Sequence, residues 1–324
     1  MPSNKTSDKP SDKTNSKVAD EHLAILASGL GKRFADFNAV DGLNLAIPKG
    51  SIFGFLGPNG CGKTTTIRML CGLLSPSCGQ VNVLGMSLPK EAEALRMRIG
   101  YMTQKFSLYD ELSVEENLTF VGDIYGLGKK SLAARISELL EQFSLGDLAS
   151  RRAGNMSGGQ KQRLALAAAT VHKPEVLFLD EPTASVDPEN RRAFWEKLFE
   201  IADSGTTILV ATHYMDEAER CHRLAVLEAG QLRIEGSPAR LVEQLEGRVL
   251  EVRAERLADL KQQLRKLSSV KSVSQAGAAL RVLLEPGQAD SVLASLHAHG
   301  DIDAQLARPS LEDVFVSVTK GERQ

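Results

Sequence analysis

Short apolar runs alternate with longer amphipathic segments from about residue 22 to about residue 245. Short apolar runs between polar residues are typical of buried strands, and longer segments with helical spacing of apolar positions are typical of helices. The strands expected on this basis are Ser51–Leu56, Val176–Leu179, Thr207–Ala211 and Leu224–Glu228. Because strands and helices follow one another along the same stretch, the pattern predicts an α/β fold for 22–245.

Within this domain, the segment from about 86 to 170 has a different composition, rich in Leu, Ala, Glu and Arg. These residues favour helices, so we expect a mostly helical subdomain there. The first 21 residues are almost all Lys, Ser, Thr, Asp, Asn and Pro. They offer too little apolar surface to offset the entropy of ordering, which predicts a disordered polar tail over 1–21.

A third pattern begins at residue 246 and continues to residue 324. It predicts a strand, a helix, two strands, a helix and a strand, and then a final helix. The order β-α-β-β-α-β is typical of a small α+β domain of the ferredoxin-like kind. The segments concerned are Arg248–Ala254, Arg256–Leu267, Val270–Gln275, Ala279–Glu285, Gln288–His297, Ile302–Leu306 and the last helix, Ser310–Thr319.

The overall composition excludes several classes of protein. The chain has 324 residues, of which 42% are hydrophobic and 25% charged, and its formal net charge is −2. This balance is ordinary for a globular protein and gives no indication of a nucleic-acid partner. Its 4 cysteines form no zinc-type spacing, so we expect a reducing compartment. No apolar run approaches the roughly 18 residues that span a bilayer, so we expect a cytosolic protein or one held at a membrane by another chain.

A glycine-rich stretch follows the first expected strand. Gly57, Gly62, Lys63 and Thr64 occur in the pattern G-x-x-x-x-G-K-T, and a helical-looking segment follows. Glycines let successive N–H groups turn toward one anion, and the helix presents its positive end to the same point. Lys63 adds charge at the β- and γ-phosphates, and the Thr64 hydroxyl can bind Mg²⁺. A plain glycine-rich turn is the alternative, but this context favours a phosphate-binding loop, with Cys61 as a spacer.

Two carboxylates follow the apolar run Val176–Leu179. In open α/β sheets the ligand lies at the carboxyl ends of the strands, where Asp180 and Glu181 are expected. Asp180 is suited to hold Mg²⁺, and Glu181 to polarise an attacking water, which is what phosphoryl transfer requires. The alternative interpretation is that these two acidic residues simply begin the loop after the strand and have no catalytic role.

Two further polar residues are weaker candidates on their own. His213 follows the strand Thr207–Ala211, where it can hydrogen-bond a γ-phosphate and a water molecule. A histidine at such a position is more often structural. Gln104 is uncharged and can contact Mg²⁺ or water reversibly, but an isolated glutamine does not by itself predict such a role.

The stretch "NMSGGQKQR" is suited to begin a helix, with Ser157 as its N-cap. A helix start with two glycines and a hydroxyl is a second anion site. Because the chain already has a phosphate loop, a second site without its own Lys is useful if it completes a nucleotide held by another copy. An ordinary capped helix is the rival interpretation.

Taken together, these motifs resemble the nucleotide-binding subunit of ABC transporters, with order and spacing in agreement from about 22 to 245. A narrower resemblance is to the ATPase subunits of bacterial drug-resistance-type ABC exporters with type-2 membrane partners. The stretches that carry it are "YMTQKFSLYDELSVEENL", "THYMDEAERC" and "PSLEDVFVSVTKG". The positions that carry the family resemblance are Gly57–Thr65, Gln104, Met156–Gln160, Leu177–Thr183, Asp187 and His213.

The resemblance implies a P-loop NTPase (ABC ATPase) core with a helical subdomain, closing head to tail with a second copy or a paralogue around two ATP molecules and Mg²⁺. Phe34 matches the aromatic residue that stacks on adenine, with Phe37 as its competitor. Asp187 matches the residue that links the two sites, and Gln104 matches the transporter-coupling position. The positions implied to contact nucleotide are Phe34, Gly57, Pro58, Asn59, Gly60, Cys61, Gly62, Lys63, Thr64, Thr65, Ser157, Gly158, Gly159, Gln160 and Asp187.

Three positions depart from the family's pattern. Met156 replaces the usual leucine, Ala35 stands where glycine is common, and "TASVD" replaces the commoner Ser-Gly-Leu-Asp form. The replacement of leucine by Met156 is close to isosteric. The "TASVD" form concerns communication between the two ATP sites of the implied dimer.

The resemblance implies an ATP-hydrolysing exporter subunit on the cytoplasmic face of the inner membrane, peripheral and bound to integral-membrane permease subunits. Segment Lys105–Tyr109, beside Gln104, is the docking site that we hypothesise for the permease. A soluble ABC ATPase acting on ribosomes or DNA is the alternative, although the chain has neither a second cassette nor an inserted coiled coil. A non-catalytic regulatory module is a third possibility, which intact Lys63, Asp180 and Glu181 disfavour.

Overall fold

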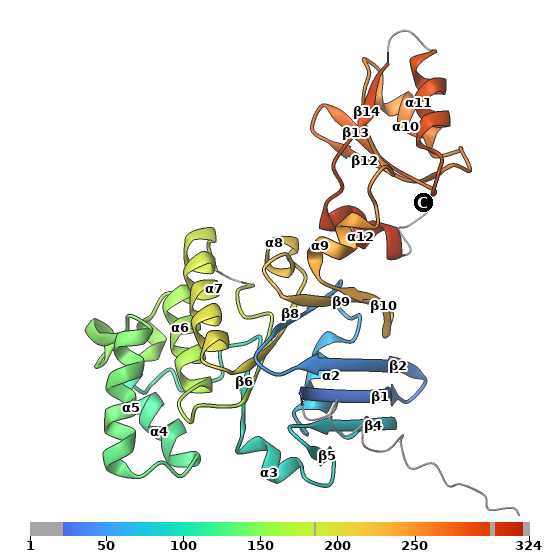
Figure 1. Ribbon diagram of the computed structural model, residues 1–324. Helices are drawn as coiled ribbons and strands as arrows, with labels where there is room; N and C mark the ends of the chain where they lie inside the picture. Colours follow the sequence, from blue (N-terminus) through green and yellow to red (C-terminus); the bar gives the residue numbers. More distant parts are fainter. Residues whose placement is uncertain (1–21, 185, 299–301, 320–324) are drawn as a thin grey trace, which may run out of the picture. The chain divides into compact units, whose positions relative to one another are not determined.

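The computed structural model describes residues 22–184, 186–298 and 302–319 (Figure 1). The predicted polar tail, 1–21, lies outside the described residues. The described chain forms two compact units. The first consists of 22–53, Asn59–Thr212 and Ala229–Gln231; the second consists of Gly54–Pro58, His213–Glu228 and the residues from Leu232 onward.

The first unit contains an antiparallel sheet and a set of parallel strands. The antiparallel sheet has the order β2-β1-β4-β5, and Figure 1 shows β1, β2 and β4 side by side. In the parallel set, β7 pairs with β6 on one side and with β8 on the other. The strands are β1 (Leu23–Phe34), β2 (Phe37–Pro48), β4 (Cys78–Val83), β5 (Met86–Leu88), β6 (Ile99–Met102), β7 (Val176–Asp180) and β8 (Thr207–Thr212).

Every residue of β7 and of β8 is buried. A strand buried on both faces consists of a continuous apolar run rather than an alternating one, which is why "VLF" and "ILVA" identified these strands in the sequence. Strand β3 (Ile52–Leu56) is also buried throughout and contains the point where the chain passes from the first unit to the second. The expected α/β fold is confirmed.

The segment 86–170 combines helices with strands β5 and β6. Because β6 pairs with β7, this segment contributes a strand to the parallel set between α3 and α4. The helices of the first unit are α2 (Lys63–Leu70), α3 (Ala92–Arg96), α4 (Val114–Ile124), α5 (Lys129–Gln142), η1 (Gly146–Leu148), η2 (Ala153–Asn155), α6 (Gly158–Ala169) and α7 (Pro188–Asp203).

The second unit contains an antiparallel sheet with the order β12-β13-β11-β14. Its elements follow the chain in the expected order, strand, helix, two strands, helix and strand, and α12 comes last. The elements of this unit are α8 (Met215–Ala218), β9 (Arg223–Glu228), β10 (Gln231–Gly236), α9 (Pro238–Glu243), β11 (Val249–Arg253), α10 (Leu257–Leu264), β12 (Val270–Ala276), β13 (Ala279–Leu284), α11 (Ala289–His297), β14 (Asp303–Leu306) and α12 (Leu311–Val318).

Alternate residues of β11 and β13 enter two different apolar clusters, as the period of two in a strand requires. One cluster, here called the sheet cluster, packs against α10 and α11. The other, here called the α12 cluster, contains residues of α9 and α12. The sheet cluster is Leu250, Val252, Leu260, Leu264, Val270, Val273, Leu280, Val282, Leu284, Val292, Leu296 and Ala304. The α12 cluster is Leu56, Ala218, Leu224, Val226, Leu241, Leu245, Val249, Leu283, Leu311 and Val314.

Within the described part of the chain, no helix is both long enough and apolar enough to cross a membrane.

Candidate active site

The glycine-rich loop leads directly into α2, whose N-cap is Gly62. Gly62 has a φ of 105°, and a Cβ atom there would lie 2.5 Å from the carbonyl oxygen of Ala39. No other residue fits this position without displacing the backbone of β2. The turn places Lys63 and Thr64 in the first turn of the helix, where backbone N–H groups have no intrahelical acceptor. The loop therefore has the geometry of a phosphate site.

Glu181 follows β7 and lies between two groups contributed by distant parts of the first unit. The Lys63 Nζ atom is 3.4 Å from Oε1 of Glu181, and the Gln104 Nε2 group donates a 2.9 Å hydrogen bond to Oε2. The side chains of Lys63 and Glu181 are only 4% and 8% exposed. The structure therefore brings together three of the predicted site residues around one buried carboxylate.

The backbone of Glu181 has a φ of 48°, a left-handed conformation that is uncommon for residues other than glycine. Its N–H group donates to the carbonyl oxygen of Ala211 at 2.9 Å, which holds this conformation against the end of β8. Such strained backbone positions are concentrated at functional sites.

Asp180 is the last residue of β7 and is buried. The Thr64 hydroxyl donates a 3.0 Å hydrogen bond to its Oδ1 atom. Burial raises the pKa of the Asp180 carboxyl, and the hydrogen bond from Thr64 opposes this increase. A hydroxyl oxygen beside a carboxylate oxygen is the kind of hard donor set that Mg²⁺ prefers. Because Mg²⁺ keeps several waters and takes oxygens from phosphates, one or two protein ligands are sufficient.

Among the described residues, no group of three or more His, Cys, Asp and Glu side chains is arranged to hold a metal ion. Cys61, in the phosphate loop, is buried, and burial raises the pKa of its thiol. A thiol that stays protonated is a poor nucleophile, and the interpretation of Cys61 as a spacer stays a prediction.

Ser157 is the N-cap of α6 and forms a reciprocal capping box with Gln160. The Ser157 hydroxyl accepts a 3.4 Å hydrogen bond from the Gln160 N–H group, and the Gln160 side chain accepts a 2.9 Å bond from the Ser157 N–H group. Within the described residues, the N–H groups of Gly158 and Gly159 have no hydrogen-bond partner. The cap therefore leaves two donors of this exposed helix start available to an anion.

Asp187 caps α7 and is joined to the start of α6 through Asn190, a residue that the sequence analysis did not single out. The Asn190 side chain donates a 2.7 Å hydrogen bond to Asp187, and its backbone N–H group donates a second bond of 3.1 Å. A Cβ atom on Gly159 would lie 3.0 Å from Cγ of Asn190. The Asn190 hydrogen bonds lower the pKa of Asp187. In the sequence, only the position of Asn190 three residues after the N-cap Asp187 could have indicated this contact.

Phe34 and Phe37 face each other across the β1–β2 turn. The two rings are 46% and 62% exposed, so both have surface on which a base can stack. The Lys32 ammonium lies 5.1 Å from the Phe34 ring centroid. Between them, Ala35 has a φ of 46°, the conformation for which glycine is preferred.

His213 directly follows β8 and belongs to the second unit. Its ring packs against the ring of Tyr214, with 4.1 Å between centroids. Gly57 and Pro58, the first residues of the phosphate loop, also belong to the second unit. The roles of these three residues beside Lys63 and Glu181 stay predictions.

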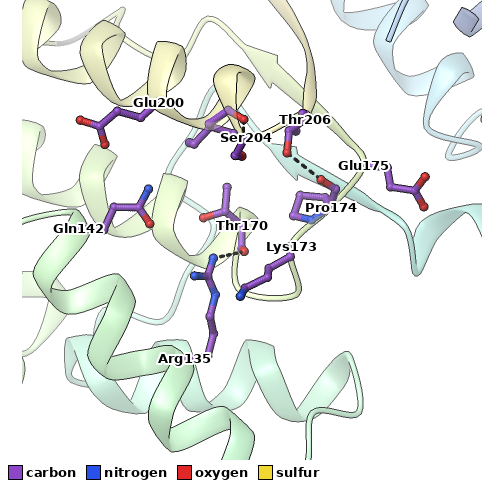
Figure 2. Close-up of a pocket in the computed structure, with 11 residues that line it drawn as sticks. Arg135, Gln142, Thr170, Lys173, Pro174, Glu175, Glu200, Ser204 and Thr206 are labelled. Carbon is purple, nitrogen blue, oxygen red and sulfur yellow. Dashed lines mark hydrogen bonds between the residues drawn. The ribbon is translucent and has the colours of Figure 1, made fainter. Parts of the chain in front are cut away.

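The first unit also contains a hollow of about 490 Å³ lined by residues of α5 and α7, by Thr170 directly after α6, and by the segments before β7 and β8 (Figure 2). None of the predicted site residues lines it. Its charged side chains are already paired: Arg135 with Glu138, Glu175 with Arg98, and Glu200 with Lys197. The Arg135 guanidinium also donates to the Thr170 and Val171 carbonyl oxygens. The hollow is therefore not part of the site.

Known proteins are similar to this chain in sequence and in fold. A sequence model of the family described as ABC transporter matches residues 40–184. The Nod factor export ATP-binding protein I of Cupriavidus metallidurans is 39% identical, over 90% of this chain and 95% of its own length. The daunorubicin resistance ATP-binding protein of Streptomyces coeruleorubidus is 36% identical, over 93% of this chain and 97% of its own length.

The probable multidrug ABC transporter ATP-binding protein YbhF of Escherichia coli is 48% identical over 66% of this chain, which spans only 37% of that relative. Among solved structures, cbiO1 of Clostridium perfringens, part of the ABC transporter complex cbiONQ, has a TM-score of 0.65 and 29% identity, covering 69% of this chain and 92% of its own. A dimeric ATP-binding cassette in a post-hydrolysis state, bound to ADP and Pi, has a TM-score of 0.61 and 25% identity, covering 66% and 98%.

Proposed function

Because the chain belongs to the family of ABC transporter ATP-binding proteins, we propose that it hydrolyses ATP with Mg²⁺ and drives export through a separate membrane permease. The observation that carries this proposal is the convergence of Lys63 and Gln104 on the buried carboxylate of Glu181. The names of the most similar relatives support export over the ribosome- or DNA-associated alternative.

In the proposed mechanism, the phosphate loop binds the triphosphate through backbone N–H groups at the start of α2 and through the Lys63 ammonium. The Thr64 hydroxyl and the Asp180 carboxylate are the groups that would hold Mg²⁺. A bound Mg²⁺ supplies charge stabilisation at the phosphate oxygens. Their contact in the structure, 3.0 Å between the two oxygens, supports this pairing.

Glu181 accepts the proton of the attacking water, and its carboxylate is oriented by the hydrogen bond from Gln104. A γ-phosphate competes with Glu181 for the Lys63 ammonium, so nucleotide binding favours release of the carboxylate for its role as a base. His213 contacts the γ-phosphate and the water. Either Phe34 or Phe37 stacks on adenine.

A second copy or a paralogue completes each site. The start of α6 in one copy, with Ser157 and the N–H groups of Gly158 and Gly159, closes on the γ-phosphate held by the other copy. Asp187 links the two sites, and its hydrogen bonds to Asn190, which packs on Gly159, connect it to the same helix start. The dimeric cassette among the similar structures supports this arrangement.

Glu181→Gln tests the proposed base. We expect hydrolysis to fall by about 100-fold or more, while ATP still binds and the protein forms an ATP-dependent dimer detectable by size-exclusion chromatography. Glu175→Gln, at the other end of the same strand, is the matched control and keeps its activity. Rapid ATP turnover by Glu181→Gln contradicts the role of this residue.

The trapped dimer also tests the shared site. Adding Ser157→Ala to Glu181→Gln is expected to weaken the dimer by about 10-fold or more, because a hydrogen bond to a charged group is lost. Ser113→Ala is the matched control, since Ser113 caps α4 with the same kind of capping box. If Ser157→Ala and Ser113→Ala behave alike, the helix start serves only as a cap.

Segment Lys105–Tyr109 is the proposed docking site for the permease, on the cytoplasmic face of the inner membrane. Tyr109, Phe120 and Ile124 are 50%, 40% and 60% exposed, beside a hollow of about 180 Å³ that Phe106 and Tyr125 help to line. Lys161, in the first turns of α6, lies 2.8 Å from Asp110 and 5.0 Å from the Phe106 ring centroid. The proposed docking segment and the residue after it therefore contact α6, the helix that Ser157 caps.

Tyr109→Glu tests this docking site. It is expected to reduce the fraction of the protein that sediments with cell membranes severalfold, because it places a charge in an apolar contact, while the soluble ATPase rate is unchanged. Leu267→Glu, at a similarly exposed residue of the second unit, is the control. Undiminished membrane association of Tyr109→Glu removes the hypothesis.

A further inference from the structure

The C-terminal helix α12 is held to the sheet of the second unit by an ion pair between buried Asp313 and partly buried Arg281. Arg281 of β13 donates 2.7 Å hydrogen bonds to both carboxylate oxygens of Asp313, one from Nε and one from Nη2. Asp313 also accepts bonds from the N–H and hydroxyl groups of Ser310, the N-cap of α12. Arg281 donates a further bond to the carbonyl oxygen of Arg308. Both the start of α12 and the segment before it are therefore held in one position.

The apolar side of α12 belongs to the α12 cluster. Leu311 and Val314 are 0% and 1% exposed, and α12 lies against α9, as Figure 1 also shows. The same cluster contains Ala218 of α8 and Leu224 of β9, and Met215 packs against it. The last helix of the chain therefore shares its core with α8, which lies almost a hundred residues earlier in the sequence.

Helix α8 begins two residues after His213 and has only 4 residues. A helix of a single turn is unstable by itself, because nucleation costs more than one turn of hydrogen bonds returns. Its position must come from tertiary packing, and its buried apolar residue Ala218, together with partly buried Met215, packs in the α12 cluster. The carbonyl oxygen of Tyr214, the residue after His213, accepts the Ala218 N–H group at 3.2 Å.

We propose that α12 is a positioning element for His213, acting through α8. By filling the α12 cluster, Leu311 and Val314 fix α8, and α8 fixes the direction in which the chain leaves β8 at His213. This inference rests on the proposed role of His213 at the γ-phosphate. It gives the C-terminal region a part in hydrolysis, although none of the described residues of that region is among the proposed catalytic or nucleotide-binding residues.

The alternative is that α12 only stabilises the second unit. The two accounts differ in what they predict for cavities of the same size in the two clusters. If α12 acts only on stability, truncating a leucine in either cluster has the same effect on hydrolysis. If α12 positions His213, only the α12 cluster changes hydrolysis.

Leu311→Ala is therefore compared with Leu296→Ala, which truncates a leucine of the sheet cluster. We expect kcat for ATP hydrolysis to fall by about 10-fold in Leu311→Ala, since a displacement of about 1 Å in a catalytic group can cost 100-fold. The KM for ATP should be unchanged, because nucleotide binding depends on the phosphate loop. Leu296→Ala should keep the normal kcat after the folded fraction is matched by circular dichroism. Leu311→Met, which conserves volume, should restore activity.

Combination with His213→Ala shows whether α12 acts through His213. If it does, Leu311→Ala lowers kcat in the normal chain but causes no further loss in the His213→Ala background. Val314→Ala, a smaller truncation in the same cluster, supplies the same comparison if Leu311→Ala does not fold.

Three outcomes overturn the proposal. Equal losses of kcat in Leu311→Ala and Leu296→Ala indicate a general effect of stability. Additive losses with His213→Ala exclude action through His213. A higher KM with normal kcat indicates that the effect reaches the phosphate loop through Leu56 instead. In each case a His213→Ala variant with a reduced but measurable kcat leaves the proposed function intact, whereas a fully active His213→Ala removes the role of His213 itself.

Discussion

An ion pair of the first unit and one of the second are built differently. In the first unit, Nζ of Lys63 lies 3.4 Å from Oε1 of Glu181, and Glu181 has a left-handed backbone conformation. Arg281 and Asp313, in the second unit, form two parallel hydrogen bonds of 2.7 Å, with Asp313 also engaged by the cap of α12. The bidentate geometry of Arg with a carboxylate is specific and strong, whereas a Lys ammonium is a point charge that accepts other anions easily.

The difference fits the two roles proposed for these pairs. In the proposed mechanism the Lys63–Glu181 pair opens when a phosphate binds, and a Lys ammonium exchanges one anion for another more easily than a bidentate Arg does. The Arg281–Asp313 pair holds α12 in place, and both oxygens of its carboxylate accept hydrogen bonds. Burial alone therefore does not distinguish a catalytic carboxylate from a structural one, and contact geometry does.

The largest expected effect comes from Lys63→Met. It removes the charge at the phosphates, so ATP hydrolysis should fall by about 100-fold or more, as when an electrostatic stabiliser of the transition state is lost. ATP affinity, measured with a fluorescent nucleotide, should fall with it. Arg281→Met removes the ion pair of the second unit, in which Asp313 is as buried as Glu181, and should leave ATP affinity unchanged. Loss of ATP affinity in both variants would erase the distinction between the two pairs.

The next effect is on stability and concerns Asp313→Asn. At pH 7 the free energy of unfolding should decrease by about 3 kcal/mol, the order expected when one partner of a buried pair is neutralised. Burial tends to raise the pKa of Asp313, but the hydrogen bonds from Arg281 and Ser310 outweigh it and lower the pKa below 3.8. A lowered folded-state pKa stabilises the protein above the unfolded value, and this contribution is lost as pH falls through the folded value.

The difference between the normal chain and Asp313→Asn should therefore be constant from pH 7 to about 5 and shrink below pH 4. Urea unfolding followed by circular dichroism measures it. Fluorescence of Trp195, the one tryptophan of the chain, which is buried in α7, reports separately on the first unit. A difference that does not change with pH would show that the ion pair is not its cause.

The smallest effect is expected from Asp110→Asn, which breaks the pair with Lys161 on the surface. The two side chains are 57% and 23% exposed, so solvent screens the interaction and the free energy of unfolding should change by about 0.5 kcal/mol. The same urea titration checks this value. A decrease in the free energy of unfolding as large as that of Asp313→Asn would show that solvent exposure does not weaken the Asp110–Lys161 pair.

Much of the fold could be predicted because its signals are local. The buried runs of β7 and β8 are continuous in the sequence, and Ser157 and Asp187 are N-caps whose partners lie three residues further along. Strand β6 was less evident, because four residues between helical-looking segments give too short a pattern to define a period.

The sequence by itself determined the chemistry that is encoded within a few residues: the glycine at a φ of 105° before Lys63, the capped start of α6, and the carboxylates that end a buried strand. Only the tertiary structure decided which of these groups meet. Gln104 and Glu181 are 77 positions apart, and Arg281 and Asp313 are 32 positions apart. A local pattern contains no information about such pairs, because their contact depends on how whole strands and helices pack together.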